Sequence, residues 1–356
     1  MESRSFGRRS APAVDRAALE LQLLELRRSV LDPREGIFGP HSKVWEVNRS
    51  SAVFLGAGRA ALLQLAHPWV ATAIDHHSRT RDDPIGRFQR TFAHVFSMVF
   101  GDLDAACRSA HRVHAVHQRV QGELPEPLHG RYLANDPEAL LWVHATLWDT
   151  SLRMFEAVVR PLRADEKERY YAETRRFAAL FGIPESVLPD DFAAFQSYVE
   201  GQLDGSLLQV TPAAAEMGDF VLRPLWPVLG PLMRRYRAFT ADFLPERLVE
   251  AFDLPRRGSR ERRAGASMLR VVRAIHPRLP DRLRELPPYV EARRRLAGQV
   301  GRDRLGERLT RVFVGSAADE RGSSGPGRGE TDSRPPPHRA RESGQASTRP
   351  GSRRRG

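Results

Sequence analysis

Apolar residues recur along this 356-residue chain at the spacing of α-helices. The stretch 104–120 shows the pattern clearly. Its apolar face is formed at spacings of four, three, four and three by Ala106, Ala110, Val113, His117 and Val120. Such spacing places side chains on one face of a helix. No segment alternates convincingly between apolar and polar residues, and no internal repeat is present. The pattern therefore predicts an all-α fold.

Turn and capping residues give the limits of the predicted helices. Asp136-Pro137 is a strong helix start, because an aspartate N-cap precedes proline at the first helical position. His67-Pro68 predicts a kink, because proline lacks the backbone N–H and crowds the preceding turn. The segment 45–53 is expected to be extended or a short helix, and 212–231 to form proline-rich turns. Helices are expected over 15–31, 58–74, 85–100, 104–120, 138–162, 165–181, 191–203, 233–243, 245–252, 260–275 and 290–300.

The two ends of the chain differ in composition from the rest. Residues 1–14 are polar, and from Gly315 onward the chain is mainly Gly, Ser, Pro and Arg. Such segments cannot bury enough apolar surface to offset the entropy lost on ordering. We therefore expect a single helical domain over 15–314, preceded by a disordered N-terminus at 1–14 and followed by a disordered tail at 315–356.

The net charge is +12, and almost all of the positive charge is arginine, since lysine occurs only at Lys43 and Lys167. These arginines are mixed with acidic residues and form no basic stripe, so no specific nucleic-acid partner is expected. The single cysteine, Cys107, excludes an internal disulfide and thiolate metal clusters. No apolar run reaches the ~18 residues of a membrane span. The sequence is compatible with peripheral contact with a membrane. A cytoplasmic location is expected.

Histidines are concentrated between residues 67 and 144, which hold nine of the twelve. Imidazole is the commonest metal ligand among side chains, so this excess is the main chemical signal. On the helix 104–120, His117 shares the apolar face, whereas His114 falls on a more polar stripe with Cys107. His76 and His77 are adjacent, so we do not expect both to face one point from a regular helix.

Most metal and nucleophile motifs are absent. The zinc motif His-Glu-x-x-His does not occur, and no glutamate lies between Glu46 and Glu123, which disfavours a carboxylate-rich metal cage. No Gly-x-Ser-x-Gly elbow is present. The glycine-rich segment 56–61 lacks the flanking strand of a dinucleotide site and is interpreted as a helix entry. A haem needs one inward-facing histidine and an apolar pocket, a requirement that His117 meets.

Five stretches of the chain, taken together and in order, carry a family resemblance. They are GRAALLQLAHP (58–68), DPIGRFQRT (83–91), VFGD (99–102), HAVHQRVQG (114–122) and DPEALLWVHATL (136–147). The sequence resembles the rubber-oxygenase (latex-clearing protein) and MpaB-type oxygenase family over about residues 35–300. The resemblance implies one globin-like helical bundle that encloses a b-type haem.

The resemblance also implies the residues of the haem pocket. The histidine that binds the iron carries over best onto His117, with His114 as the alternative. An arginine and a threonine four residues apart, with a basic residue before the threonine, match Arg87, Arg90 and Thr91. The resemblance makes these the residues that would line the haem pocket.

The sequence also departs from the family pattern. Rubber oxygenases carry a lysine at the position of Arg90, and arginine cannot lose a proton to cap the iron. They also use a glutamate as pocket base, whereas residues 47–122 contain none. His67 and His77 are the candidates to replace it. No export signal is recognised, so extracellular rubber is not the expected substrate.

The resulting prediction is a haem b-dependent oxygenase. Its expected substrates are O2 and an apolar unsaturated small molecule, isoprenoid or lipid, whose C=C bond is cleaved. The cleavage and the substrate class come from the resemblance alone. The alternative from a different class is a non-catalytic haem- or lipid-binding helical protein.

Overall fold

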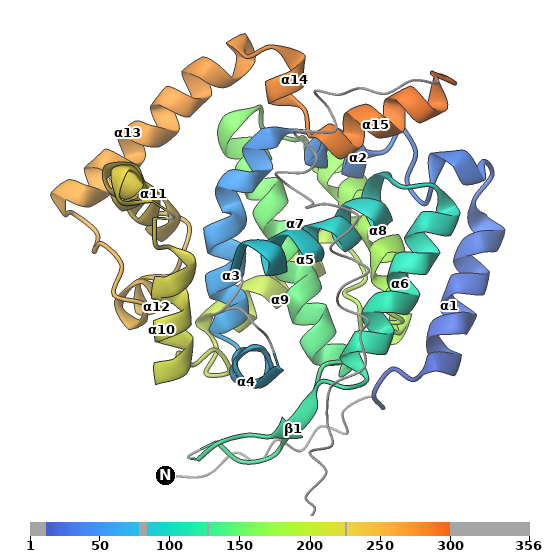
Figure 1. Ribbon diagram of the computed structural model, residues 1–356, viewed down its shortest axis with the longest axis horizontal. Coiled ribbons are helices and arrows are strands. Elements are labelled where there is room, and N and C mark those ends of the chain that lie inside the picture. The colour runs from blue at the N-terminus through green and yellow to red at the C-terminus, as the bar shows by residue number, and fades with distance from the viewer. Residues whose placement is uncertain (1–11, 78–83, 127, 225, 300–356) are drawn as a thin grey trace, which may run out of the picture. The chain divides into compact units, whose positions relative to one another are not determined.

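A computed structural model describes residues 12–77, 84–126, 128–224 and 226–299, apart from the side chains of Pro84, Ile85, Arg87 and Phe88. These residues belong to one compact unit. They form fifteen α-helices, five short 3₁₀ helices and one two-stranded hairpin (Figure 1). The predicted helical fold is confirmed. The predicted tail at 315–356 lies outside the described residues.

The helices follow one another along the whole described chain. Their bounds are α1 Arg16–Ser29, α2 Lys43–Asn48, α3 Ala57–Leu65, α4 Pro68–His77, α5 Pro84–Phe100, α6 Leu103–His117, α7 Pro137–Val158, α8 Ala164–Ala179, α9 Phe192–Asp204, α10 Pro212–Val221, α11 Gly230–Ala241, α12 Glu246–Ala251, α13 Arg260–Ile275, α14 Asp281–Arg284 and α15 Pro287–Leu296. The hairpin consists of β1 Gln121–Glu123 and β2 Arg131–Leu133, which pair antiparallel.

Local chemistry explains where several helices begin and end. Asp15, Asp102, Asp136 and Asp191 each act as N-cap, with a carboxylate oxygen that accepts from a backbone N–H in the first turn. A side chain that satisfies these otherwise unpaired donors stabilises the helix start. The expected break at His67-Pro68 is also present, because α3 ends at Leu65 and α4 begins at Pro68.

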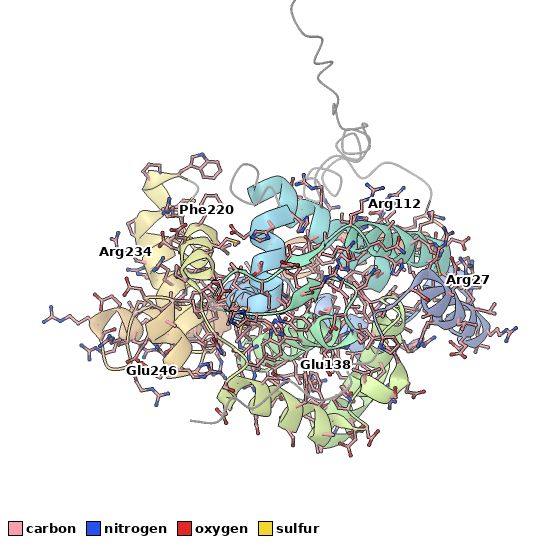
Figure 2. All side chains as sticks on the ribbon, turned by 90° about the horizontal axis from the view of Figure 1, so that it is seen from below. Arg27, Arg112, Glu138, Phe220, Arg234 and Glu246 are labelled. Atoms are coloured by element: carbon pink, nitrogen blue, oxygen red, sulfur yellow. The ribbon has the colours of Figure 1, made fainter. Side chains whose placement is uncertain are left out.

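Helices α1 and α11 lie at opposite ends of the described fold, with α7 between them (Figure 1). Arg27 on α1 and Arg234 on α11 mark these ends in the perpendicular view (Figure 2). Helix α7 contacts α2, α3, α8, α9 and α13. Its central position agrees with its buried residues, which occur on every side of the helix.

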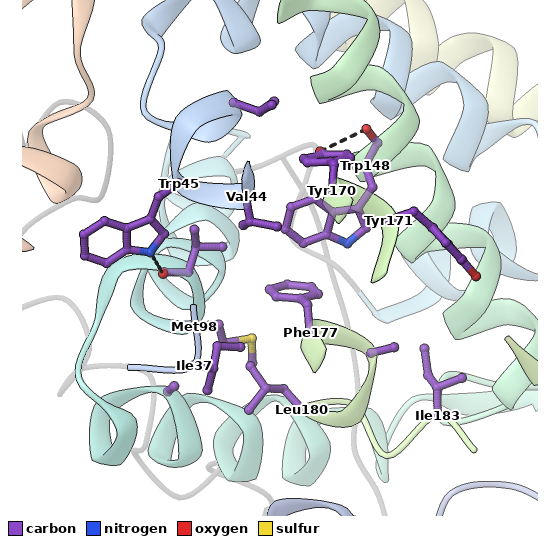
Figure 3. Close-up of a cluster of buried hydrophobic side chains, with 14 of the residues drawn as sticks. Ile37, Val44, Trp45, Met98, Trp148, Tyr170, Tyr171, Phe177, Leu180 and Ile183 are labelled. Carbon is purple, nitrogen blue, oxygen red and sulfur yellow. Dashed lines mark hydrogen bonds between the residues drawn. The ribbon is translucent and has the colours of Figure 1, made fainter. Parts of the chain in front are cut away.

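The larger core cluster joins α1, α2, α5, α6, α7 and α8 (Figure 3). Two buried polar groups are satisfied inside it. The indole Nε1 of Trp45 donates to the Val99 carbonyl at 2.7 Å, and the Tyr170 hydroxyl donates to the Trp148 carbonyl at 3.2 Å. A smaller cluster joins α3, α10 and α12, where the Trp142 indole donates to the Leu63 carbonyl at 3.0 Å. Large aromatic residues can be buried here because their N–H and O–H groups have acceptors.

Three parts of the fold differ from the sequence prediction. Residues 212–221 form helix α10 where turns were expected, because Thr211 caps it and Pro212 occupies its first position. The β1–β2 hairpin was not predicted, since three-residue strands are too short to show alternation. Val14 is buried and its N–H bonds to the Asn135 carbonyl at 2.9 Å, so order begins before residue 15.

None of the described helices is long and apolar enough to span a membrane.

Candidate functional site

Helix α6 carries the two histidines predicted as alternative iron ligands. Its buried stripe includes Ala106, Cys107, Ala110 and His114, whereas His117 is only partly buried. The expected assignment of Cys107 and His114 to a polar stripe is therefore wrong. The reason is packing, because α6 contacts both α1 and α5 and so buries a wider arc than its most apolar residues define.

His117 ends α6, next to Asn135 from the segment before α7. The surrounding protein shields the ring from water, and this desolvation lowers the pKa of His117 to about 4. The nearby His114 acts in the same direction. A side-chain hydrogen bond between His117 and Asn135 opposes this shift. The ring is therefore neutral near pH 7 and is oriented by Asn135.

His114 offers a different feature. Its Nε2 is buried and has no hydrogen-bond partner among the described residues, and burial lowers the pKa of its ring. Charged residues at the start of α1, Asp15 and Arg16, also influence that pKa. His114 therefore faces the start of α1, while His117 faces Asn135.

His144 lies inside α7 and is held by its own helix. The Trp148 indole N–H donates to His144 Nδ1 at 3.1 Å, one helical turn away. Burial lowers the pKa of His144 to about 3, so the ring is neutral. Because Nδ1 accepts a proton donor, the ring proton is on Nε2, and Nε2 is a buried donor without a partner. In this tautomer, His144 has no free lone pair for a metal.

His67 lies at the break between α3 and α4, where proline interrupts the helix. Its side chain is buried against Trp69, and burial lowers its pKa to about 4. Its Nδ1 has no hydrogen-bond partner among the described residues. His67 is thus a neutral imidazole with an unused ring nitrogen, as a proton acceptor requires.

His76 and His77 meet at the hydroxyl of Tyr132. His76 Nδ1 lies 3.1 Å and His77 Nε2 lies 2.9 Å from that oxygen. The expectation that adjacent histidines cannot face one point is therefore wrong, because they occupy the last turn of α4 and Tyr132 approaches from the hairpin. Tyr132 is itself buried, and a Cβ at Gly122 would lie 2.6 Å from its hydroxyl. Only glycine at 122 leaves room for this arrangement.

Helix α5 carries the predicted Arg87, Arg90 and Thr91. The side chain of Arg87 lies outside the described residues. Arg90 and Thr91 are both exposed. The opposite side of α5, with Phe92, Phe96 and neighbouring residues, points into the fold. The structure therefore does not bring Arg90 or Thr91 to the interior.

An apolar cavity of about 60 Å³ lies between α5, α7, α3 and the 3₁₀ helix η2 (Ser51–Gly56). Its walls include Phe54, Phe92, Phe96 and Trp148. The polar side chains on its lining are those of Asn48, Thr150 and Ser151. No acidic, basic or histidine side chain of the described residues lines it. Trp148 nevertheless connects the cavity wall to His144 through the indole hydrogen bond.

A buried ion pair supports one side of this cavity. Arg59 Nη2 lies 2.7 Å from Asp149 Oδ2, and Arg59 also donates to the Thr150 hydroxyl and the Phe243 carbonyl. Burial lowers the pKa of Arg59, and the charge of Asp149 opposes that shift. The pair joins α3 to α7 and fixes Thr150 at the cavity wall.

The sequence prediction missed three residues of this region: Asn135, Tyr132 and Asp149. Asp149 could have been found, because it lies in an apolar helix and needs a buried counter-ion. Asn135 and Tyr132 gave no such signal, because each acts on a residue distant in the sequence.

The described residues contain no cluster of side chains that could form a multi-ligand metal site. No group of three or more His, Cys, Asp or Glu residues there is placed to hold a metal ion. A haem, however, requires only one protein ligand to its iron.

Comparison with known proteins places the chain among uncharacterised and oxygenase sequences. It is 30% identical over 125 residues to Uncharacterized protein Mb2261 of Mycobacterium bovis and to Uncharacterized protein Rv2237 of Mycobacterium tuberculosis. The match covers 33% of this chain and 48% of each relative, so the chain spans about half the length of these curated relatives. No solved structure matches it.

A family model described as "ER-bound oxygenase mpaB/B'/Rubber oxygenase, catalytic domain" matches residues 45–274, which is more than half of the chain. The matched range includes each predicted site residue, from His67 to His117. The chain belongs to the MpaB and rubber-oxygenase catalytic-domain family.

Proposed function

We propose that this protein is a haem b-dependent oxygenase that acts on an apolar unsaturated small molecule, isoprenoid or lipid, and cleaves its C=C bond. The single observation that carries the proposal is the pairing of His117 with Asn135 inside a catalytic domain of the oxygenase family. A metal-ligating histidine nearly always donates its other ring N–H to a polar acceptor, which fixes the tautomer. We propose that His117 donates its ring N–H to the Asn135 side chain in this way.

The donor chemistry fits a haem. The iron needs one neutral imidazole nitrogen, and the pKa of about 4 keeps His117 neutral at physiological pH. His114 is the alternative ligand, because its buried Nε2 has no partner among the described residues. When bound, haem b supplies the redox chemistry with O2.

The volume of the apolar cavity limits what the cavity can hold. A space of about 60 Å³ is far below the roughly 300–1,000 Å³ of cofactor pockets. It is large enough for O2 or for one apolar group of a substrate and too small for a porphyrin. The fit to haem therefore rests on the histidine donor and not on this cavity. The expected globin-like arrangement stays a prediction.

The remaining residues have proposed roles of their own. The aromatic walls around Phe92 and Phe96 exclude water from an apolar group held in the cavity. His67 is the preferred pocket base over His77, because its Nδ1 is unused whereas His77 bonds to Tyr132. The pocket-lining role that the family resemblance assigns to Arg87 stays a prediction, whereas the exposed positions of Arg90 and Thr91 do not support such a role for them.

An absorption spectrum after haem-supplemented expression tests the cofactor. A Soret band is expected, and His117→Ala should abolish or shift it, while His129→Ala should not, because His129 is exposed. A band that persists in His117→Ala and disappears in His114→Ala would transfer the ligand to His114. A colourless wild-type protein would remove haem from the proposal.

A second function is favoured by a specific observation: no titratable side chain of the described residues lines the cavity. A non-catalytic haem- or lipid-binding protein would need none. O2 consumption with an unsaturated lipid separates the two functions. Haem binding without substrate-dependent O2 uptake would support the binding protein.

A cytoplasmic location is likewise proposed, and fractionation of expressing cells tests it.

A further inference from the structure

Four large apolar side chains are exposed on the stretch 221–232, which runs from the end of α10 into the first turn of α11. Their exposed fractions are 37% for Val221, 63% for Trp226, 81% for Val228 and 50% for Leu232. Phe220 and Arg234, which flank this stretch, both lie toward the same end of the fold (Figure 2). Scattered exposed apolar residues are ordinary, but a group on one short segment marks an interaction site.

These side chains are not displaced core residues. Leu222 of the same stretch and Phe239 further along α11 are buried and supply the core contacts. Pro227 opens the 3₁₀ helix η4 (Pro227–Leu229), and Pro231 occupies the first turn of α11. Since proline fixes φ, the backbone presents Trp226 and Val228 outward with little freedom to withdraw them.

The charged residues within this stretch of the sequence are all positive. From Phe220 to Ala241 the sequence contains four arginines and no acidic residue. Arg223 and Arg237 both pair with Asp219, before this stretch. Arg234 and Arg235 are exposed and make no ion pair or hydrogen bond with any described residue. Two unpaired cations therefore border the exposed apolar group.

We propose that Val221, Trp226, Val228, Leu232, Arg234 and Arg235 form a surface that binds the interface of an anionic phospholipid bilayer. Tryptophan and aliphatic side chains partition into the headgroup region, and adjacent arginines attract anionic lipid. A second copy of this chain fits less well, because a symmetric contact would bring the arginines of both copies together. The proposal concerns a surface away from the cavity and does not depend on oxygenase activity.

Vesicle co-sedimentation of the full chain tests this surface. Wild-type protein should bind vesicles of phosphatidylcholine that contain phosphatidylglycerol and should bind pure phosphatidylcholine weakly. Trp226→Glu and Leu232→Glu should each weaken binding at least tenfold. Arg234→Glu and Arg235→Glu should each weaken it by about fivefold or more, which corresponds to ~1 kcal/mol per basic residue at an anionic surface.

Helix α1 offers matched controls at the opposite end of the fold. Leu21 and Leu24 are 64% and 45% exposed, and these fractions are similar to the 63% of Trp226 and the 50% of Leu232. Leu21→Glu and Leu24→Glu should leave vesicle binding unchanged. Equal binding by wild type and the four surface variants would overturn the proposal, and so would binding that does not require phosphatidylglycerol. A dimer in sedimentation velocity that Trp226→Glu dissociates would replace lipid with a second copy.

Tryptophan fluorescence gives a second readout. Of the five tryptophans, Trp45, Trp142 and Trp148 are buried, Trp69 is partly exposed and Trp226 is the most exposed. Anionic vesicles should shift the emission to the blue, and brominated lipid should quench it. Trp226→Phe should still sediment with vesicles but lose most of the spectral change. A full change in Trp226→Phe would mean that another surface meets the lipid.

Discussion

The indole N–H of Trp148 donates to Nδ1 of His144 at 3.1 Å, across one turn of α7. Trp148 also forms part of the cavity wall, and its ring packs edge-on against Phe177 with centroids 4.9 Å apart. One residue therefore fixes both the tautomer of a buried histidine and the shape of the cavity.

Trp148→Phe should destabilise the protein by about 1–3 kcal/mol, because it leaves a buried imidazole nitrogen without its donor. Chemical denaturation measures the loss. Trp226→Phe provides the control, and because Trp226 is exposed it should change stability by less than about 0.5 kcal/mol. Similar losses in the two variants would mean that the indole hydrogen bond contributes little.

Asp149→Asn should destabilise the protein by about 3–5 kcal/mol, because it removes the charge that balances the buried Arg59. Urea denaturation measures this change. Replacing both residues, as in Arg59→Met with Asp149→Leu, should recover much of the loss, since no uncompensated charge stays buried. The exposed pair Arg16–Glu20 is the control, and Glu20→Gln should cost no more than about 1 kcal/mol. A loss in Asp149→Asn as small as that of Glu20→Gln would contradict a structural role for the buried pair.

Asn135→Leu should weaken haem binding about 10- to 100-fold, because His117 loses the acceptor that orients its ring. The rate of haem transfer to apomyoglobin measures this without any assay of activity. Asn135→Asp keeps an acceptor oxygen and should retain haem better than the leucine variant. Unchanged transfer from Asn135→Leu would show that Asn135 does not support the ligand.

Stability should fall as pH decreases from about 6.5 to about 4. The pKa values of His67 and His117 are lowered to about 4 and that of His144 to about 3, so the unfolded chain binds protons first. Each neutral histidine therefore contributes stability that is complete above pH ~6.5. Below pH ~6.5, the stabilising contribution of each histidine falls by up to about 1.4 kcal/mol per pH unit.

Denaturation midpoints across this pH range test the contribution of a single ring. His144→Gln should reduce the slope of stability against pH, whereas His129→Gln should not, because the His129 side chain is exposed. A wild-type stability that is flat between about pH 6.5 and pH 4.5 would contradict the assignment of neutral rings to these three histidines.

The positions of the helices were largely available from the sequence. The predicted segment 260–275 coincides with α13, and Asp136 caps α7 as its position before Pro137 indicated. Periodicity, caps and proline breaks act between residues a few positions apart. They therefore appear in the sequence without knowledge of the fold. The family resemblance was likewise carried by ordered local motifs, and the family match confirmed it.

The orientation of side chains toward distant partners was decided by the tertiary structure. His114 is buried because α1 covers its side of α6, although the alanines of that helix allow more than one buried face. Arg59 and Asp149 are ninety positions apart and pair only because α3 packs on α7. His76 and His77 converge because Tyr132 arrives from a hairpin that shows no sequence pattern. The sequence thus determined which segments are helical, since hydrogen bonding within a helix is local. Packing determined which residues meet, since burial depends on the neighbour that covers each face.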